Sequence, residues 1–235
     1  MKKFKNVFLL AAMAVSAVCV TSCGDDDEPA GGGSSFAGVI HAVFSDKNTS
    51  LGEVKVVVND YTDQENNSAQ NNIKSYELAH GEYANGGFTL TLPNPVPDEC
   101  LLPYGYVYAY NRDSRKYELQ PRYNDLYMGI ASDDEAKYLF LTEASFVPYN
   151  KNGVNIGGYV GGYEFDAPVG FLYVDRDVDI IELPVPGGGK PGETNTWHLK
   201  KGWTLLVEYG LGGGSYTTTI SPSTDIERWY FSEIR

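Results

Sequence analysis

The sequence predicts an all-β protein, and three observations lead to that prediction. Beyond residue 36 the apolar side chains recur almost entirely with a period of two, the repeat of a half-buried strand. Turn-forming residues follow at short intervals, with 26 Gly and 12 Pro in 235 residues. Eleven or twelve short strands favour sandwiches of antiparallel sheets over a helical body. The expected strands cover residues 38–44, 54–59, 74–79, 88–92, 105–110, 137–142, 154–165, 170–174, 178–183, 204–209, 216–220 and 228–234.

The alternation is clearest in two stretches. Residues 54–59 place valine at every second position, and residues 88–92 alternate large apolar side chains with threonine before Pro93. Both patterns are typical of strands with one buried face. The helix that the sequence allows is short, at 124–129 or at 132–136, where Ser132 could act as the N-cap.

The N-terminal segment has the features of a secretory signal. Three lysines among the first five residues precede an apolar or weakly polar run at residues 7–20. A membrane-spanning helix needs about 20 apolar residues, so this run predicts a signal-peptide core. Val20-Thr21-Ser22-Cys23 resembles the lipobox of bacterial lipoproteins. The resemblance implies that residues 1–22 are a lipoprotein signal peptide and that Cys23 is the lipidation site, an ordinary signal being the alternative.

A tether is expected at residues 23–35. Gly24 is followed by the acidic run Asp25-Asp26-Asp27-Glu28 and then by a stretch rich in Gly and Ser, which is typical of a flexible linker. The acidic run resembles the export signal of Bacteroides-type surface lipoproteins, although a merely solvated charge run is the alternative. The resemblance implies an outer-membrane protein that is lipid-anchored and faces the cell exterior.

The first β unit is expected at residues 36–145. Its motifs are Gly38-Val39-Ile40, a second strand at residues 51–58, and Gly86-Gly87-Phe88-Thr89-Leu90-Thr91-Leu92-Pro93. Together they resemble the transthyretin-like, carboxypeptidase-regulatory-like type of β-sandwich. A polar insert at residues 60–72 departs from that pattern and predicts a solvated loop. The resemblance implies a structural or accessory module without a catalytic constellation of its own.

A second β-sandwich-like unit is expected at residues 146–235. Glycine pairs at 157–158 and 161–162 punctuate its strands, and residues 184–195 form a loop rich in Pro and Gly. Three segments, Phe171-Leu172-Tyr173-Val174, Leu199-Lys200-Lys201-Gly202-Trp203 and Arg228-Trp229-Tyr230-Phe231, are similar to the C-terminal halves of uncharacterised outer-membrane lipoproteins of the same bacterial group. The two units could pack closely enough to count as one domain.

Cysteine usage excludes an intrachain disulfide in the mature chain. Cys19 leaves with the signal and Cys23 is expected to carry lipid, so Cys100 has no partner. Neither His nor Lys stands beside Cys100 in the sequence, which favours a small buried hydrophobe over a nucleophile.

No pattern of titratable residues points to catalysis or to a cofactor. The three histidines, at positions 41, 80 and 198, are scattered, and neither a Gly-x-Ser-x-Gly nor a His-Glu-x-x-His pattern occurs. Asp175, Asp177 and Asp179 alternate and could attract calcium on a straight strand. Because Val174 and Val178 flank them symmetrically, a turn between two strands is the preferred interpretation. The sequence therefore predicts neither a catalytic residue nor a metal site.

The aromatic residues are the one group that suggests a site. Tyr104, Tyr106, Tyr108 and Tyr110 alternate along one expected strand. Such a row could be a stacking platform for sugars, because the apolar face of a pyranose packs on aromatic rings. It could equally fill the core and pair across strands. Tyr106, Tyr108 and Tyr110 are the candidate ligand-binding residues. Among the three tryptophans, Trp203 is the one most expected in the core.

Charge and composition narrow the class of function. The net charge of −13 argues against nucleic acid and against docking on anionic lipid heads, both of which need basic patches. The leading hypothesis is a non-enzymatic surface lipoprotein that binds a glycan or a neighbouring outer-membrane protein. The alternatives are a structural or adhesion subunit, such as a fimbria-associated protein, and a glycan-active hydrolase.

Overall fold

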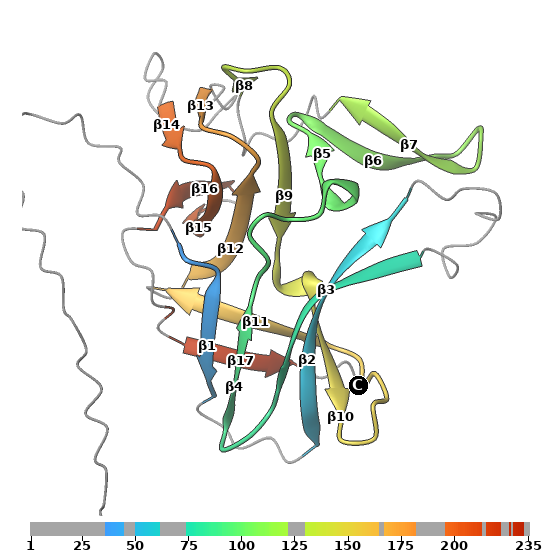
Figure 1. Ribbon diagram of the computed structural model, residues 1–235, viewed down its shortest axis with the longest axis vertical. Coiled ribbons are helices and arrows are strands. Elements are labelled where there is room, and N and C mark those ends of the chain that lie inside the picture. Colours follow the sequence, from blue (N-terminus) through green and yellow to red (C-terminus); the bar gives the residue numbers. More distant parts are fainter. Residues whose placement is uncertain are drawn as a thin grey trace, which may run out of the picture.

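The computed structural model describes residues 36–44, 50–61, 74–121, 130–164, 167–181, 196–212, 215–221, 226 and 228–232. Within these ranges the predicted all-β, sandwich-like fold is confirmed: several antiparallel sheets pack together, and helical backbone is limited to η1 (Asp98–Cys100) and η2 (Glu143–Ser145). The strands are β1 (Val39–Val43), β2 (Leu51–Asp60), β3 (Lys74–Glu82), β4 (Gly87–Thr91), β5 (Leu102–Pro103), β6 (Tyr106–Asn111), β7 (Lys116–Pro121), β8 (Ile130–Ala131), β9 (Lys137–Leu141), β10 (Phe146–Asn150), β11 (Tyr159–Glu164), β12 (Ala167–Val174), β13 (Val178–Ile181), β14 (Thr196–Leu199), β15 (Gly202–Gly212), β16 (Ser215–Ile220) and β17 (Arg228–Ser232) (Figure 1).

Two small sheets form one wall of the main core. β1 pairs with β4, and β2 pairs with β10 on one side and β3 on the other. Alternation along β1 buries Ile40 to 2% exposure and leaves Val43 73% exposed. On β2 the expected alternation holds for Val54 and Val56, which are fully buried. A register shift after Val56 then leaves Val58 only partly buried, because a bulge turns the strand.

A tight turn at Asn85-Gly86 joins β3 to β4. Both residues have positive φ, at 54° and 88°, which is the conformation that a two-residue hairpin turn requires. β3 nevertheless pairs with β2, and β4 pairs with β1, so the turn carries the chain from one sheet to the next. β3 and β4 approach each other closely. A Cβ on Gly81 of β3 would lie 2.5 Å from the carbonyl oxygen of Thr89 of β4.

The largest sheet is built around β12. β15 runs along one edge of β12, while β11 and then β9 occupy the other edge. Phe171 and Tyr173 face the main core, and Leu172 and Val174 face a second core on the opposite side. Because both faces are covered, every β12 residue except Pro168 is buried. This explains the nearly continuous apolar run of this strand, which lacks the alternation of a half-buried one.

The second core is closed by a third layer of strands. The small sheet β14-β13-β8 packs on the outer face of the largest sheet. Ile180 of β13 and Trp197 of β14 are buried there against Leu172 and Leu206. The described body is therefore a three-layered arrangement with the β12 sheet in the middle.

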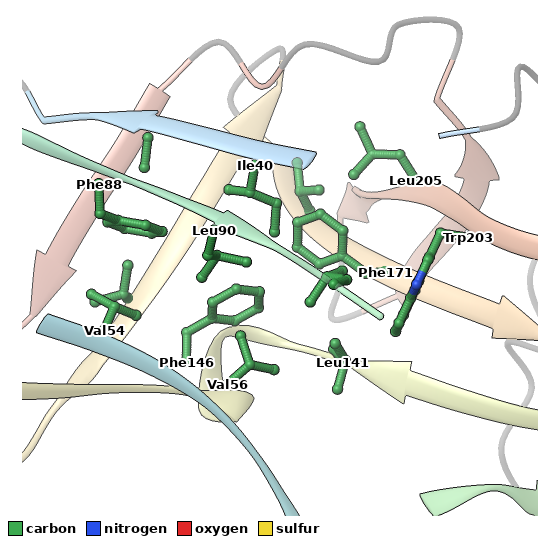
Figure 2. Packing of buried hydrophobic residues seen from close by; sticks show 14 of the residues in the cluster. Ile40, Val54, Val56, Phe88, Leu90, Leu141, Phe146, Phe171, Trp203 and Leu205 are labelled. Atoms are coloured by element: carbon green, nitrogen blue, oxygen red, sulfur yellow. The ribbon is translucent and has the colours of Figure 1, made fainter. Parts of the chain in front are cut away.

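Both cores draw on residues from before and after position 145. In the main core Phe88 and Leu90 lie with Phe171 and Trp203 (Figure 2). β9 pairs with β12, and β10 pairs with β2, so sheets also cross this position. The cores and the strand pairings thus both join residues 36–145 to residues 146–235.

The structure adds strands that the sequence analysis did not predict. These are β5, β7, β8, β10 and β14. β10 contains Pro148, which has no backbone N–H to donate to a neighbouring strand. Proline is tolerated there because β10 is an edge strand of the β10-β2-β3 sheet.

The short helix considered at 132–136 is wrong. This segment forms a turn, and the Ser132 hydroxyl, expected to cap a helix, instead accepts a hydrogen bond of 3.1 Å from the Asp179 amide. The alternative position, 124–129, lies outside the described residues.

Gly161 and Gly162 lie inside β11, which corrects the expectation that this pair punctuates the strands. Gly161 is directly opposite Tyr230 of β17. A Cβ on Gly161 would come within 2.6 Å of the Tyr230 hydroxyl oxygen, so the glycine makes room for the tyrosine ring across the strand pair. The glycine content of this region therefore partly reflects aromatic packing.

Candidate functional site

The candidate tyrosines lie on a two-stranded hairpin formed by β6 and β7, drawn in green at the edge of the molecule (Figure 1). Its turn is fixed by side chains. Asn111 accepts a hydrogen bond of 2.9 Å from the Asp113 amide, and Glu118 accepts one of 2.6 Å from the Ser114 hydroxyl. The bonds from Ser114 and Asn111 hold the pKa of Glu118 below its usual range, because they favour the charged carboxylate. This network gives the hairpin a defined end.

Tyr106, Tyr108 and Tyr110 share one face of β6, as the alternation predicted. Tyr106 is 39% exposed and Tyr110 is 43% exposed, while Tyr108 is partly buried. Core filling, the alternative interpretation of this row, does not describe Tyr106 or Tyr110.

Tyr104 does not belong to this row. It lies in a turn before β6, next to Gly105 with φ of 81°, so the chain changes direction between Tyr104 and Tyr106. Tyr104 is 8% exposed and packs in the second core, with its ring centroid 5.2 Å from that of Tyr138. The expectation that four tyrosines line one strand is therefore wrong for the first of them.

β7 and the end of β2 extend the aromatic surface. Leu119 stands opposite Tyr108, and Tyr117 stands opposite Tyr110. Tyr61, just after β2, packs its ring against those of Tyr108 and Tyr117, at centroid distances of 5.5 and 4.7 Å. We call this surface the tyrosine face; it consists of Tyr61, Tyr106, Tyr108, Tyr110, Tyr117 and Leu119.

Some of these additional residues could have been predicted from the sequence. Residues 116–121 have apolar groups at alternate positions, which could have indicated a strand pairing with β6. The position of Tyr61 depends on a contact between segments about fifty residues apart, which no local pattern reveals.

A cavity of about 410 Å³ lies beside the tyrosine face. This volume is within the range of about 300–1,000 Å³ that small-molecule pockets have. β2, β9, β10, η1, η2 and the start of β6 surround it. Its lining residues are Val57, Val58, Asn59, Asp60, Tyr61, Glu99, Cys100, Leu101, Leu102, Val107, Tyr108, Tyr138, Leu139, Phe140, Leu141, Ala144, Ser145 and Val147.

Cys100 is the buried, unpaired thiol that the sequence predicted. It is 6% exposed and free, and it forms part of the cavity wall. Burial raises the pKa of the thiol, and the nearby charges of Glu99 and Asp60 add to this effect. A thiol held neutral in this way is a poor nucleophile, because the thiolate is the reactive form.

The turn preferred for the three alternating aspartates is confirmed. β12 ends at Val174 and β13 begins at Val178, so the carboxylates of Asp175, Asp177 and Asp179 do not line a straight strand. Each binds a different group. Their partners are the Lys137 amide for Asp175 at 2.9 Å, the Lys201 amide for Asp177 at 2.8 Å and the His198 Nδ1 for Asp179 at 2.7 Å. The hydrogen bond from the Lys201 amide is the main reason that the pKa of Asp177 lies below its usual value, and the bond from the Lys200 ammonium adds to this effect.

The three histidines lie on three different strands. His41 is exposed on β1 and bonds Thr89 at 3.0 Å, while His80 and His198 each contact a carboxylate. Across the described ranges, no group of three or more His, Cys, Asp or Glu side chains is arranged to hold a metal ion.

Glu164 is a buried carboxylate that the sequence analysis missed. It is 2% exposed, and its Oε2 accepts a hydrogen bond of 2.5 Å from the Ser221 hydroxyl. Its Oε1 is also buried, without a hydrogen-bond partner among the described residues. No second carboxylate is bonded to it in that part of the chain, and its contact with Ser221 ties β11 to the end of β16.

Cys23, the expected lipidation site, lies outside the described residues. Over the ranges that the structure covers, no helix has the length and apolar character needed to cross a membrane.

Comparisons with known proteins found no match. No protein-family model, curated protein or solved structure is significantly similar to this chain.

Proposed function

We propose that this protein is a non-enzymatic surface lipoprotein whose β6–β7 hairpin binds a glycan. The observation that supports this proposal most strongly is the exposure of Tyr106 and Tyr110, at 39% and 43%, on one face of a two-stranded hairpin. Large aromatic side chains that are exposed together are typical of interaction surfaces.

The chemistry of the tyrosine face suits a sugar. A pyranose ring has one apolar face of C–H groups, which can stack on an aromatic ring, while its hydroxyl groups remain available for hydrogen bonds. Tyrosine supplies both a flat apolar surface and a phenol oxygen at its edge. Contacts of Tyr61 with Tyr108 and Tyr117 hold part of the face in place before a ligand arrives, which reduces the entropy lost on binding.

The N-terminal sequence supports a surface location. The lipobox-like residues 20–23, the acidic run at 25–28 and the linker up to residue 35 follow the order expected for a lipid-anchored protein held away from a membrane. The resemblance of residues 36–145 to transthyretin-like modules, which are mostly accessory proteins, favours binding over catalysis.

Replacing both Tyr106 and Tyr110 by alanine is expected to weaken glycan binding at least tenfold, or about 1.4 kcal/mol. The ligand is first found by screening the mature chain against a panel of host and dietary polysaccharides, and its affinity is then measured by calorimetry. Both side chains are more than a third exposed, so the double variant is expected to fold normally.

Ile181→Ala is the matched control, because Ile181 is 43% exposed on β13, which belongs to the β14-β13-β8 sheet and not to the hairpin. It is expected to leave the affinity unchanged. Glycan binding that survives the double variant would contradict the proposal, as would the absence of binding to the whole panel. Release of reducing sugar in the same incubations would favour the hydrolase instead.

A further inference from the structure

The cavity beside the tyrosine face has two chemically different ends. One end has apolar walls, with Phe140 and Leu141 of β9 and Val147 of β10 among its lining residues. Its acidic lining residues, Asp60 and Glu99, lie at the end of β2 and in η1, whereas the polar Ser145 lies in η2. Asn59 and Glu99 are exposed at this polar end, and Ala144 is exposed in η2, so solvent reaches the cavity wall on both sides.

The polar end is acidic. Asp60 and Glu99 both line the cavity, whereas none of the described lining residues is Lys, Arg or His. Asp60 also accepts a hydrogen bond of 3.0 Å from the Tyr76 hydroxyl, a contact that orients the carboxylate. The ammonium group of Lys137 binds Asp98, next to Glu99, and does not line the cavity.

Aromatic rings stand at the same end. Tyr61 and Tyr108 line the cavity with ring centroids 5.5 Å apart and planes inclined by 34°. A cation close to the face of a tyrosine ring is attracted by the negative charge density of that face. Carboxylates and tyrosine faces together favour a positively charged group, while the walls beyond favour an apolar one.

We infer that this cavity binds an amphipathic organic cation, with the ammonium group between Glu99, Asp60 and the two tyrosine rings and the apolar part against β9 and β10. An anionic amphiphile of the same size is disfavoured, because its head would lie against two carboxylates. The inference is independent of glycan binding. The cavity shares Tyr61 and Tyr108 with the tyrosine face but does not include Tyr106 or Tyr110.

Three probes with eight carbons in a straight chain, the carboxylate carbon of octanoate included, separate the contribution of the head group. Octyltrimethylammonium, 1-octanol and octanoate are titrated into the mature chain by calorimetry, below the concentrations at which they aggregate. The cation is expected to bind about tenfold more tightly than octanoate, and 1-octanol is expected to have an intermediate affinity. The difference combines a cation–π contact with a partly screened charge interaction. Equal or tighter binding of octanoate would overturn the inference, as would the failure of all three probes to bind at millimolar concentration.

Two variants test the position of the bound probe. Glu99→Gln keeps the shape of an exposed side chain and removes its charge, so it is expected to weaken the cation about threefold and leave 1-octanol unchanged. Glu82→Gln, an exposed carboxylate at the end of β3 that does not line the cavity, is the charge-matched control and should change neither. Cation binding that is the same in Glu99→Gln and in the control would overturn the assignment.

Ala144→Phe tests the apolar part. Ala144 is exposed in η2 and lines the cavity, so a phenyl ring there is expected to obstruct the cavity at little cost to folding. All three probes should then lose affinity, and unchanged binding would contradict the assignment. The Tyr106→Ala, Tyr110→Ala double variant should bind octyltrimethylammonium normally, so failure of this inference and failure of glycan binding are distinguishable.

Discussion

Replacing Trp203 by alanine is expected to lower the free energy of unfolding by about 3–5 kcal/mol, the cost typical of removing a large buried aromatic side chain. Trp203 is 2% exposed in the main core, and its ring centroid lies 5.2 Å from that of Tyr173. Its indole Nε1 donates a hydrogen bond of 2.9 Å to the carbonyl oxygen of Pro93, just after β4. Alanine would leave a cavity in the core and a carbonyl without its partner.

Urea unfolding followed by far-UV circular dichroism measures this loss. Ile181→Ala, on the exposed side of β13, is the control and should change stability by less than about 0.5 kcal/mol. If Trp203→Ala cost no more than the control, Trp203 would not occupy the core position described here.

Replacing Cys23 by alanine is expected to move the protein from the membrane fraction to the soluble fraction almost completely. The reason is that the proposed anchor is the lipid on this sulfur and, by family resemblance, on the new amino terminus. Single acyl chains bind membranes only marginally, whereas two or three hold a protein effectively permanently. Cell fractionation with immunoblotting gives the distribution.

Cys19→Ala is the matched control, because it removes a thiol four residues earlier, inside the expected signal, and leaves the lipobox-like cysteine intact. This variant should remain in the membrane fraction. Retention of the Cys23→Ala protein in the membrane would show that another feature holds it there.

Local alternation was enough to predict most strands of the fold. Along β1, the burial of Ile40 and exposure of Val43 follow directly from the period of two. Predictions were least accurate where long-range contacts decide the outcome. β12 is buried on both faces because the β14-β13-β8 sheet covers its outer side, and nothing within residues 167–174 indicates which strands will do so.

Short strands were missed for a related reason. β8 has two residues and pairs with β13, from which it is separated by almost fifty positions. A strand of this length has no measurable period, so only its partner identifies it. β14, at Thr196–Leu199, begins directly after the expected Pro/Gly-rich loop at 184–195, and its four residues are too few to establish a period.

The candidate site was predictable in part. Alternation placed Tyr106, Tyr108 and Tyr110 on one face, and that face is exposed at two of the three positions. Tyr104 was grouped with them because the sequence does not show that Gly105 takes a positive φ and turns the chain. The cavity could not be predicted, since its walls come from β2, β9 and β10, which meet only in the folded chain.

The central claim is that a glycan rests on the tyrosine face of the β6–β7 hairpin. The most direct test is an NMR measurement of intermolecular Overhauser effects between the best-binding oligosaccharide and ring-labelled tyrosines, assigned with Tyr106→Phe and Tyr110→Phe variants. We expect contacts from the ring protons of one sugar to Tyr106 or Tyr110. The claim would be contradicted if the sugar contacted only tyrosines that belong neither to this hairpin nor to position 61.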